Sequence, residues 1–404
     1  MIRGDHIQFL DGFRFLLAFW VFLAHYYTLI GGSKFFELPK FLNESLNKPV
    51  VAVYGFMIIT GFLMTHNYLA RGVREPYDKW LTFRNFWLRR LFRLYPVYMV
   101  AVIIAFVTFV PCAELNELNL IYFTGSNVSQ WGTVRSVLQP GLADLFTHVF
   151  MIHGLFPHYY DSILGVTWSL SLEMQFYFLF PFLFLAVFAS NATLKRHLVI
   201  TLVIFGVLAL FSPKLLDLIT NRGNVPRFTL PSILIYVMPF FLLGMVSAGV
   251  KCRKMHPLFL AVALVLILPF QWLVTNVVII IFLLFLFLEE MRTILPDYLF
   301  NCTAMARSLL SGRLAAFGAD ISYSMYLIHT LLIGFCIRLV IRHLPSLESS
   351  KIAVAIAGLL ITLVICFALG YLIFRFIEKP FIEIGKRVIR SKNAAMTVGA
   401  NAPE

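Results

Sequence analysis

"LDGFRFLLAFWVFLAHYY", residues 10–27, is an apolar run interrupted by three strongly polar side chains, Asp11, Arg14 and His25. On an α-helix, the eleven steps from Arg14 to His25 leave a net rotation of roughly 20° and a rise of roughly 16 Å. Both side chains therefore share one helix face at two membrane depths. A charged arginine inside a bilayer costs at least about 2.5 kcal/mol, which favours a face turned towards protein or a watery cavity. The alternative is that Arg14 and His25 snorkel to the two membrane interfaces.

The composition excludes an ordinary soluble domain. Of the 404 residues, 60% are hydrophobic and 13% are charged, whereas soluble domains average about 25% charged residues. Repeated long apolar windows predict an all-α, polytopic integral membrane protein. We predict ten transmembrane helices, at about residues 13–31, 50–67, 94–111, 168–189, 198–212, 230–250, 257–271, 272–288, 319–341 and 351–374.

The basic residues predict the orientation of these spans. If the N-terminus is cytoplasmic, 22 of the 33 Lys and Arg residues lie in inside segments, ten lie outside, and Arg14 is intramembrane. The positive-inside rule then places both termini in the cytoplasm, so the net charge of +13 need not indicate nucleic acid. The first span reads as a retained helix and not as a signal peptide. The short apolar segment 142–156 suits a re-entrant or interfacial piece.

A single domain accounts for most of the chain. We expect a transmembrane domain over residues 1–390 and a disordered cytoplasmic tail over residues 391–404. The five cysteines show neither metal-ligand spacing nor a disulfide framework.

A second polar group lies in "GVTWSLSLEMQFYFLFP", residues 165–181. Ser169, Glu173 and Tyr177 recur at intervals of four residues and form a stripe on one helix face. An intramembrane carboxylate is by default a functional hypothesis. Its alternative, a structural partner for a buried cation, is equally open at this point.

A cluster of arginines begins the third predicted span, in "LRRLFRLYPVY", residues 88–98. Such a cluster usually anchors the cytoplasmic end of a helix and contacts anionic lipid. The spacing of Arg90 and Arg93 also suits a clamp on the phosphates of a cytoplasmic donor.

A third polar face lies in "ISYSMYLIHTLLI", residues 321–333, where Tyr323, Tyr326 and His329 recur every three residues. A lone histidine in a helix is more often a satisfied interior residue than a catalyst. Three hydrogen-bonding groups along one membrane helix favour a helix that lines a cavity.

Together these stretches resemble acyltransferase family 3, the bacterial O-acetyltransferase-like membrane enzymes, along about residues 7–381. One departure from the family pattern is Thr60, which stands where the family usually has serine and which keeps a hydroxyl. The resemblance is carried, in the family's motif order, by "LDGFRFLLAFWVFLAH" (Arg14, His25), "GFMIITGFLM" (Thr60), "RRLFRLYP" (Arg90, Arg93, Tyr95, Pro96), "WSLSLEMQFYFLFP" (Trp168, Ser169, Glu173), "ISYSMYLIH" (Tyr323, Tyr326, His329) and "FIEKPF" (Glu378, Pro380).

The resemblance implies a multi-pass enzyme of the cell (inner) membrane that transfers an acyl group, most often acetyl, from cytoplasmic acyl-CoA to a hydroxyl group. The acceptor it implies is a carbohydrate, free or lipid-linked, such as lipopolysaccharide O-antigen, exopolysaccharide or peptidoglycan. Acetyl-CoA is then the donor, membrane lipid is the surrounding partner, and neither a metal nor a nucleic acid is expected.

The resemblance and the residue chemistry also imply a division of roles. Arg90 and Arg93 would hold the phosphates of coenzyme A. Arg14 would guide the donor or stabilise charge on its thioester oxygen. His25 would act as general base towards the acceptor hydroxyl, or would carry the acyl group itself. Glu173 would orient His25 as the acid member of a dyad. The expected residues of the substrate cavity are Trp168, Ser169, Tyr177, Tyr323, Tyr326 and His329.

Three other interpretations stay open from the sequence. A secondary transporter also uses intramembrane Arg, His and Glu, although we find no inverted repeat and no pair of broken helices. An acyltransferase with a cytoplasmic lipid or small-molecule acceptor fits the same motifs. A non-catalytic assembly partner would bind no acyl donor.

Overall fold

The computed structural model describes residues 7–72, 75–126, 139–188 and 228–399, and the backbone of 128–129 and 132–133. This part of the chain is helical, apart from two antiparallel two-residue strands, β1 (Val128–Ser129) and β2 (Gly132–Thr133). The all-α prediction is therefore confirmed for the described residues.

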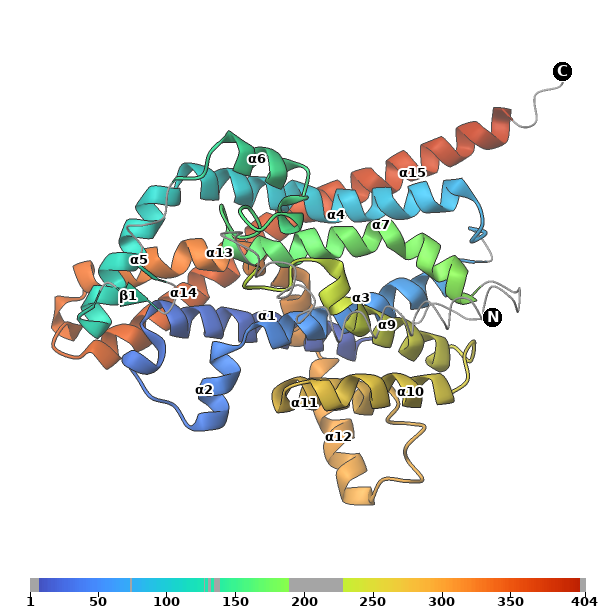
Figure 1. The fold of residues 1–404 in the computed structure, drawn as a ribbon, viewed down its shortest axis with the longest axis horizontal. Helices are drawn as coiled ribbons and strands as arrows, with labels where there is room; N and C mark the ends of the chain where they lie inside the picture. The colour runs from blue at the N-terminus through green and yellow to red at the C-terminus, as the bar shows by residue number, and fades with distance from the viewer. Residues whose placement is uncertain are drawn as a thin grey trace, which may run out of the picture.

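Among the described residues, seven helical segments are long and apolar enough to cross a membrane. Most of them run along the long axis of the molecule in Figure 1. The last segment starts as α14 and continues through a π-helical turn, η7, into α15. Their bounds are α1 (Phe9–Leu29), α3 (Val50–Arg71), α4 (Trp80–Val107), α7 (Trp168–Phe188), α9 (Leu234–Lys251), α13 (Arg313–His343), α14 (Lys351–Ile373), η7 (Phe374–Glu378) and α15 (Lys379–Gly399).

These seven segments coincide with seven of the ten predicted spans. The predicted spans 257–271 and 272–288 form shorter apolar helices, α10 (Leu258–Ile267) with the 3-10 turn η5 (Leu268–Phe270), and α11 (Leu273–Leu286). The predicted span 198–212 lies outside the described residues. The count of ten spans stays a prediction.

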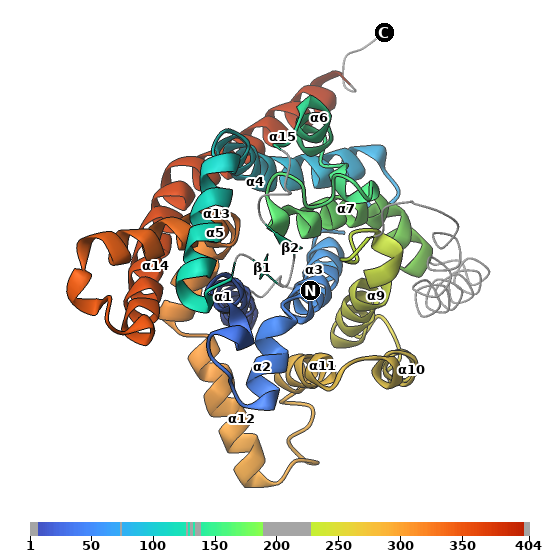
Figure 2. The ribbon, with the colours of Figure 1, turned by 60° about the vertical axis from the view of Figure 1, so that its left-hand side comes forward.

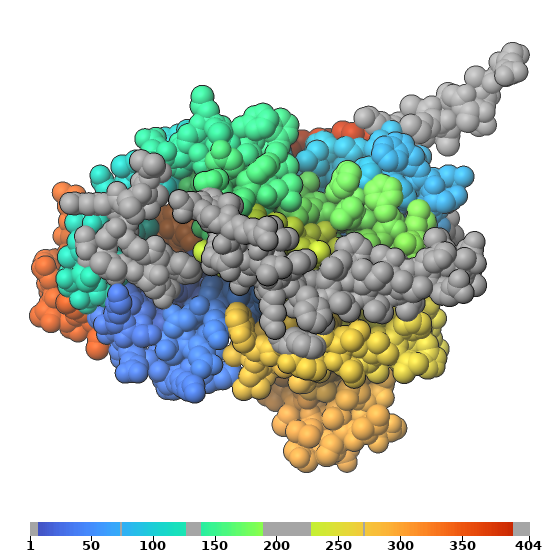
Figure 3. Space-filling model, in the orientation of Figure 1, coloured from blue at the N-terminus to red at the C-terminus, as the bar shows by residue number. Residues whose placement is uncertain are grey.

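The connections contain helices that the sequence pattern did not reveal. α5 packs against α13, where the buried Asn119 side chain donates a hydrogen bond to the Gly334 carbonyl oxygen over 2.9 Å. α12 stands out from the body of the molecule (Figures 1 and 3). The connecting helices are α2 (Lys40–Asn47), α5 (Phe109–Thr124), α6 (Leu142–Val149) and α12 (Asp297–Leu310), with the 3-10 turns η1 (Gly32–Lys34), η3 (His153–Leu155), η4 (Gly165–Thr167) and η6 (Pro345–Leu347).

Two predicted boundaries can be compared with the structure directly. α6 has eight residues, so the segment 142–156 contains no helix long enough to span a bilayer. At the C-terminus, α15 continues to Gly399, whereas the sequence predicted disorder from residue 391. The helical backbone there follows from a stretch that contains neither proline nor an internal glycine before Gly399.

α3 and α9 cross very closely because each has a glycine at the contact. A Cβ atom on Gly61 would collide with the carbonyl oxygen of Phe241, and one on Gly244 would collide with the carbonyl oxygen of Ile58. Beside this crossing, the buried rings of Phe176 and Phe241 stack with centroids 3.9 Å apart. Small residues that let two backbones approach are a common means of packing membrane helices.

Five helices, α1, α3, α4, α7 and α13, surround the middle of the molecule in the rotated view of Figure 2. α1 packs against both α3 and α13, and α4 packs against both α7 and α13. This arrangement brings together the polar stretches that the sequence distributes over more than 300 residues.

Candidate active site

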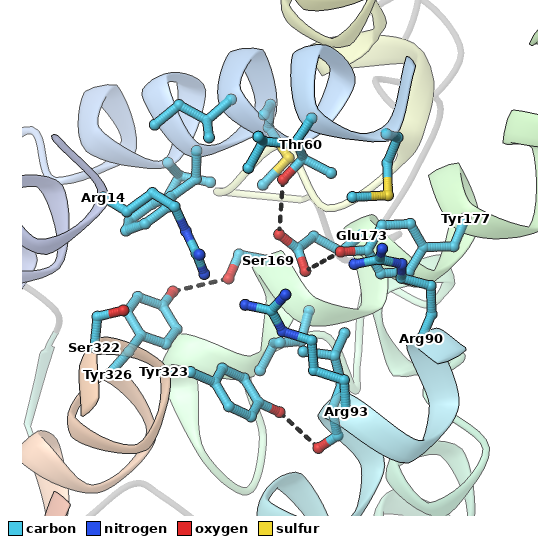
Figure 4. A pocket seen from close by; sticks show the side chains of 18 residues that line it. Arg14, Thr60, Arg90, Arg93, Ser169, Glu173, Tyr177, Ser322, Tyr323 and Tyr326 are labelled. Carbon is cyan, nitrogen blue, oxygen red and sulfur yellow. Dashed lines mark hydrogen bonds between the residues drawn. The ribbon is translucent and has the colours of Figure 1, made fainter. Parts of the chain in front are cut away.

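The five central helices enclose a cavity that holds most of the predicted site residues (Figure 4). It contains about 760 Å³ of space, its open mouth included. Apolar side chains from α3 form much of one wall. The polar residues that line it are Arg14, Thr60, Arg90, Arg93, Ser169, Glu173, Tyr177, Ser322, Tyr323 and Tyr326. We call this space the arginine cavity.

The structure separates the arginines of α4 into two kinds. The guanidinium of Arg89 donates two hydrogen bonds, of 2.9 and 2.8 Å, to the carboxylate of Glu75. Arg90 and Arg93 instead line the arginine cavity. The Arg90 guanidinium lies 5.7 Å from the ring centres of both Phe86 and Tyr177, and its buried Nε atom has no hydrogen-bond partner among the described residues. Arg90 and Arg93 therefore present positive charge to the cavity, because no described carboxylate forms an ion pair with either.

Arg14 reaches the same cavity from the opposite side, on α1. Its guanidinium points towards the hydroxyl groups of Ser169 and Tyr326 in Figure 4. Within the described part of the chain, no hydrogen bond or ion pair holds Arg14. Three cations from two helices thus converge on one space, a pattern that suits a polyanionic ligand.

Glu173 is the carboxylate that lines the arginine cavity. It accepts a hydrogen bond of 3.3 Å from the Thr60 hydroxyl and one of 3.1 Å from the Tyr177 hydroxyl. Ser169, Glu173 and Tyr177 all line this cavity, so the predicted stripe on α7 forms one continuous polar wall. Thr60, which stands where the family usually has serine, therefore still provides a hydroxyl that donates a hydrogen bond to Glu173.

A second carboxylate, Glu378, is buried near Arg93 and Arg14 without lining the arginine cavity. It accepts a hydrogen bond of 3.2 Å from the Ser324 hydroxyl and interacts electrostatically with Arg93 and Arg14. Glu378 belongs to the π-helical turn η7, and such turns often occur at functional sites. The sequence identified Glu378 only as part of a motif and assigned it no role.

His25 lies in a different cavity, which we call the histidine cavity. It contains about 820 Å³ of space, open space included, and its polar lining comes from α1, the end of α2, the loop before α7, the start of α7, the segment before α9, and α13. The residues that line it are Val21, His25, Thr28, Asn47, Pro49, Val50, Val53, Asp161, Gly165, Val166, Trp168, Thr229, Leu230 and Tyr326. An indole beside a carboxylate, an amide and hydroxyl groups is a lining that suits a polyhydroxylated ligand.

Asp161 is a site residue that sequence reasoning missed. It lies in a loop, where no helical period marks the side chains that face a cavity. Burial raises the pKa of the Asp161 carboxyl above its ordinary value, and a hydrogen bond with Tyr160 opposes that shift. The carboxyl is therefore held more easily in its protonated form than a carboxyl in open water.

Tyr326 separates the two cavities. It lines both of them, as does Val53. The Tyr326 hydroxyl lies 2.8 Å from the Ser169 hydroxyl and 3.0 Å from the Val166 carbonyl oxygen. Those two contacts hold the phenol ring in place as a partition between the arginine cavity and the histidine cavity.

The expected contact between Glu173 and His25 is not made. Glu173 faces the arginine cavity, and His25 lines the histidine cavity. The partner of His25 is His329 on α13, whose Nε2 lies 3.2 Å from the Nδ1 of His25. The interpretation of Glu173 and His25 as a dyad is therefore corrected: the two residues come from helices whose polar faces open into different cavities.

The other predicted substrate-site residues can be placed as follows. Ser169, Tyr177 and Tyr323 line the arginine cavity, Trp168 lines the histidine cavity, and Tyr326 lines both. The Tyr323 hydroxyl also donates a hydrogen bond to the Leu94 carbonyl oxygen over 2.8 Å. His329 is buried behind His25 and lines neither cavity. In the described residues, no group of three or more potential metal ligands lies together.

Fold and site together define a multi-pass membrane protein with two polar cavities along its central helices. The chain belongs to acyltransferase family 3: the family model described as an acyltransferase domain matches residues 7–371. The resemblance found from the motifs is thereby confirmed, and the protein is a membrane acyltransferase. No curated protein and no solved structure matches the chain significantly.

Proposed function

We propose that the protein transfers an acetyl group from acetyl-CoA, bound in the arginine cavity, to a hydroxyl group of a carbohydrate held in the histidine cavity. The observation that carries this proposal is the position of Tyr326. Among the described residues, Tyr326 and Val53 line both the space that holds three arginines and the space that holds a histidine and Trp168. The donor and the acceptor of a group transfer need two such adjoining spaces.

The charge of the arginine cavity supports an acyl-CoA donor. Arg90, Arg93 and Arg14 face one lining carboxylate, Glu173. Phosphate groups are bound best by guanidinium groups, which donate hydrogen bonds in a fixed fork. In this proposal Arg90 and Arg93 hold the phosphates, and the arginine cavity opens to the cytoplasm, where acyl-CoA is found. Both chain termini are then cytoplasmic and the histidine cavity opens outwards.

Arg14 and Glu173 take roles that follow from their places. The Arg14 guanidinium points towards the partition made by Ser169 and Tyr326 (Figure 4). A cation there stabilises the negative charge that develops on the thioester oxygen during transfer. Glu173, held by Thr60 and Tyr177, balances part of the positive charge before the donor binds.

His25 is the general base of this proposal. It takes the proton of the acceptor hydroxyl, whose oxygen attacks the acyl carbon. The C–S bond then breaks, and the proton passes to the leaving sulfur of coenzyme A. An extracytoplasmic glycan, such as a lipopolysaccharide, an exopolysaccharide or peptidoglycan, free or lipid-linked, is the acceptor that we propose, in a cell (inner) membrane.

The decisive experiment compares a gene-deletion strain complemented with wild type, His25→Ala or an empty vector. We expect mass spectrometry of the surface polysaccharides to show an acetyl increment only with the wild type, at equal amounts of protein in the membrane. In membrane vesicles, label from radioactive acetyl-CoA should appear in the same polysaccharide. If the label appeared in a cytoplasmic lipid or small molecule instead, that molecule and not a glycan would be the acceptor. Unchanged acetylation with His25→Ala would overturn the role of His25. A transporter would consume no thioester at all.

A further inference from the structure

The imidazole rings of His25 on α1 and His329 on α13 are in contact, although the two residues are 304 positions apart in the sequence. Nε2 of His329 lies 3.2 Å from Nδ1 of His25, and the ring centroids are 5.0 Å apart. The other nitrogen of His329, Nδ1, lies 2.8 Å from the Tyr326 carbonyl oxygen. Nδ1 of His25 also lies 2.9 Å from the Val21 carbonyl oxygen.

These contacts determine where the protons lie. A carbonyl oxygen only accepts hydrogen bonds, so Nδ1 of His329 carries the proton and Nε2 of the neutral ring has a lone pair. Nδ1 of His25 faces that lone pair and the Val21 carbonyl oxygen, which are both acceptors. Nδ1 of His25 therefore carries a proton as well.

The nitrogen that remains for chemistry is Nε2 of His25. It makes no hydrogen bond with any described residue, and His25 lines the histidine cavity. In the Nδ1–H tautomer, Nε2 has the lone pair that a base or a nucleophile needs. The other titratable groups around His25 are His329, which is 1% exposed, the Tyr326 phenol and the Asp161 carboxyl of the same cavity.

We propose that His329 is a positioning residue, which together with the Val21 carbonyl oxygen holds His25 in the Nδ1–H tautomer and so directs the lone pair of Nε2 into the histidine cavity. This inference rests on the proposed function. During transfer, the acceptor O–H proton moves to Nε2, the acceptor oxygen bonds to the acyl carbon, and the C–S bond breaks. The imidazolium of His25 then donates its Nδ1–H to Val21 and to neutral His329 until the Nε2 proton passes to sulfur. His329 therefore orients His25, a role that the sequence analysis assigned to Glu173.

Two substitutions of His329 separate this role from simple packing. His329→Leu fills the space without an acceptor, whereas His329→Gln places an amide oxygen near the position of Nε2. With acetyl-CoA as donor and membranes of the deletion strain as acceptor source, we expect His329→Leu to lower kcat roughly 10- to 100-fold. The KM for acetyl-CoA should stay within about twofold, because the arginine cavity is untouched. His329→Gln should recover most of kcat. Equal losses in both variants, or a loss confined to KM, would overturn the positioning role.

A spectroscopic measurement tests the tautomer without turnover. Solid-state ¹⁵N spectra of histidine-labelled protein in lipid, wild type minus His25→Ala, isolate the signals of His25. We expect a protonated Nδ1 and an unprotonated Nε2 in the wild type. In His329→Leu we expect a population of the Nε2–H tautomer beside the Nδ1–H form that the Val21 carbonyl oxygen still supports. A wild-type signal from protonated Nε2 with bare Nδ1 would overturn the inference. Absence of acetyl transfer by the wild type would overturn the proposed function itself, whereas normal transfer by His329→Leu would overturn only the role of His329.

Discussion

The side chains of Ser169 on α7 and Tyr326 on α13 meet at 2.8 Å and close the boundary between the arginine cavity and the histidine cavity. In the proposed function, this boundary keeps a thioester bound in the arginine cavity from water in the histidine cavity. The acyl group must then reach past the boundary during transfer, so we expect the contact to govern how much donor is lost to hydrolysis.

Tyr326→Ala should therefore raise hydrolysis of acetyl-CoA in the absence of acceptor. Removal of the phenol ring joins the two cavities and admits water to the thioester. Tyr326→Phe is the matched control, because it keeps the ring as a partition and removes only the hydroxyl contacts. Thiol release from acetyl-CoA by purified protein in detergent measures the effect, and equal hydrolysis by both variants and the wild type would refute the partition. Size-exclusion profiles check folding, since loss of a buried aromatic side chain costs about 3–5 kcal/mol.

Arg93→Gln and Arg90→Gln should weaken donor binding. A hydrogen bond to a charged group contributes about 1.5–3 kcal/mol, so we expect the KM for acetyl-CoA to rise roughly 10- to 100-fold for each substitution. High salt should reduce the difference from the wild type, because added ions screen the remaining charges. Steady-state kinetics over a range of acetyl-CoA concentrations gives the KM.

Arg89 provides the control for these substitutions. Its charge is already paired with Glu75, at 2.8 Å, on the outside of the arginine cavity. The double variant Arg89→Gln, Glu75→Gln removes the pair without leaving one charge alone, and it should keep the wild-type KM for acetyl-CoA. A rise in KM equal to that of Arg93→Gln would show that Arg89, Arg90 and Arg93 act together as a general basic surface.

His148 and His153 should make the protein sensitive to mild acid. Their rings stack with centroids 3.9 Å apart, in α6 and η3, outside the seven candidate membrane spans. Burial lowers the pKa of His148 to about 4 and that of His153 to about 3. In the unfolded chain both groups titrate near 6.5, so the unfolded state binds more protons below that pH and stability falls as the pH decreases towards 4.

We expect the melting temperature of the detergent-solubilised protein to drop from about pH 7 to about pH 5, and His148→Gln to reduce that drop. The matched control is His158→Gln, because His158 is exposed and should change nothing. A pH dependence that is identical in wild type and His148→Gln would assign the acid sensitivity to other groups.

Gly61→Ala should destabilise the contact between α3 and α9. Its new Cβ would meet the Phe241 carbonyl oxygen, so the two helices must move apart. Overpacking of this kind costs about 1–3 kcal/mol, and we expect a lower melting temperature and reduced acetyl transfer. Gly141→Ala serves as the control, because the nearest atom to its new Cβ is a carboxylate oxygen of Asp144 at 3.7 Å. Equal melting temperatures for both variants would contradict a tight glycine contact.

Residues on one helix could be related from the sequence because helical geometry is regular. The stripe of Ser169, Glu173 and Tyr177 was predicted from its spacing, and all three residues line one cavity. Arg90 and Arg93 were selected as the pair that faces a donor, and the structure shows Arg89 paired elsewhere. The amino-acid pattern of a loop carries no such period, which is why Asp161 escaped notice.

Relations between helices could not be obtained in the same way. A hydrophobic period states which face of a helix is buried, but it does not state which other helix covers that face. The expected pair of His25 and Glu173 was wrong for this reason: the neighbour of His25 is His329, 304 residues away in sequence.

By itself, then, the sequence determined a membrane protein built from apolar helices, because burial of so many apolar residues leaves no soluble alternative. It also determined which faces of those helices are polar, and its motifs identified the family. Only the tertiary structure decided that Arg14 and His25, on one helix, open into two separate cavities. The physical reason is that Tyr326, from α13, packs between the two cavities and is held there by hydrogen bonds to Ser169 of α7 and to the Val166 carbonyl oxygen in η4.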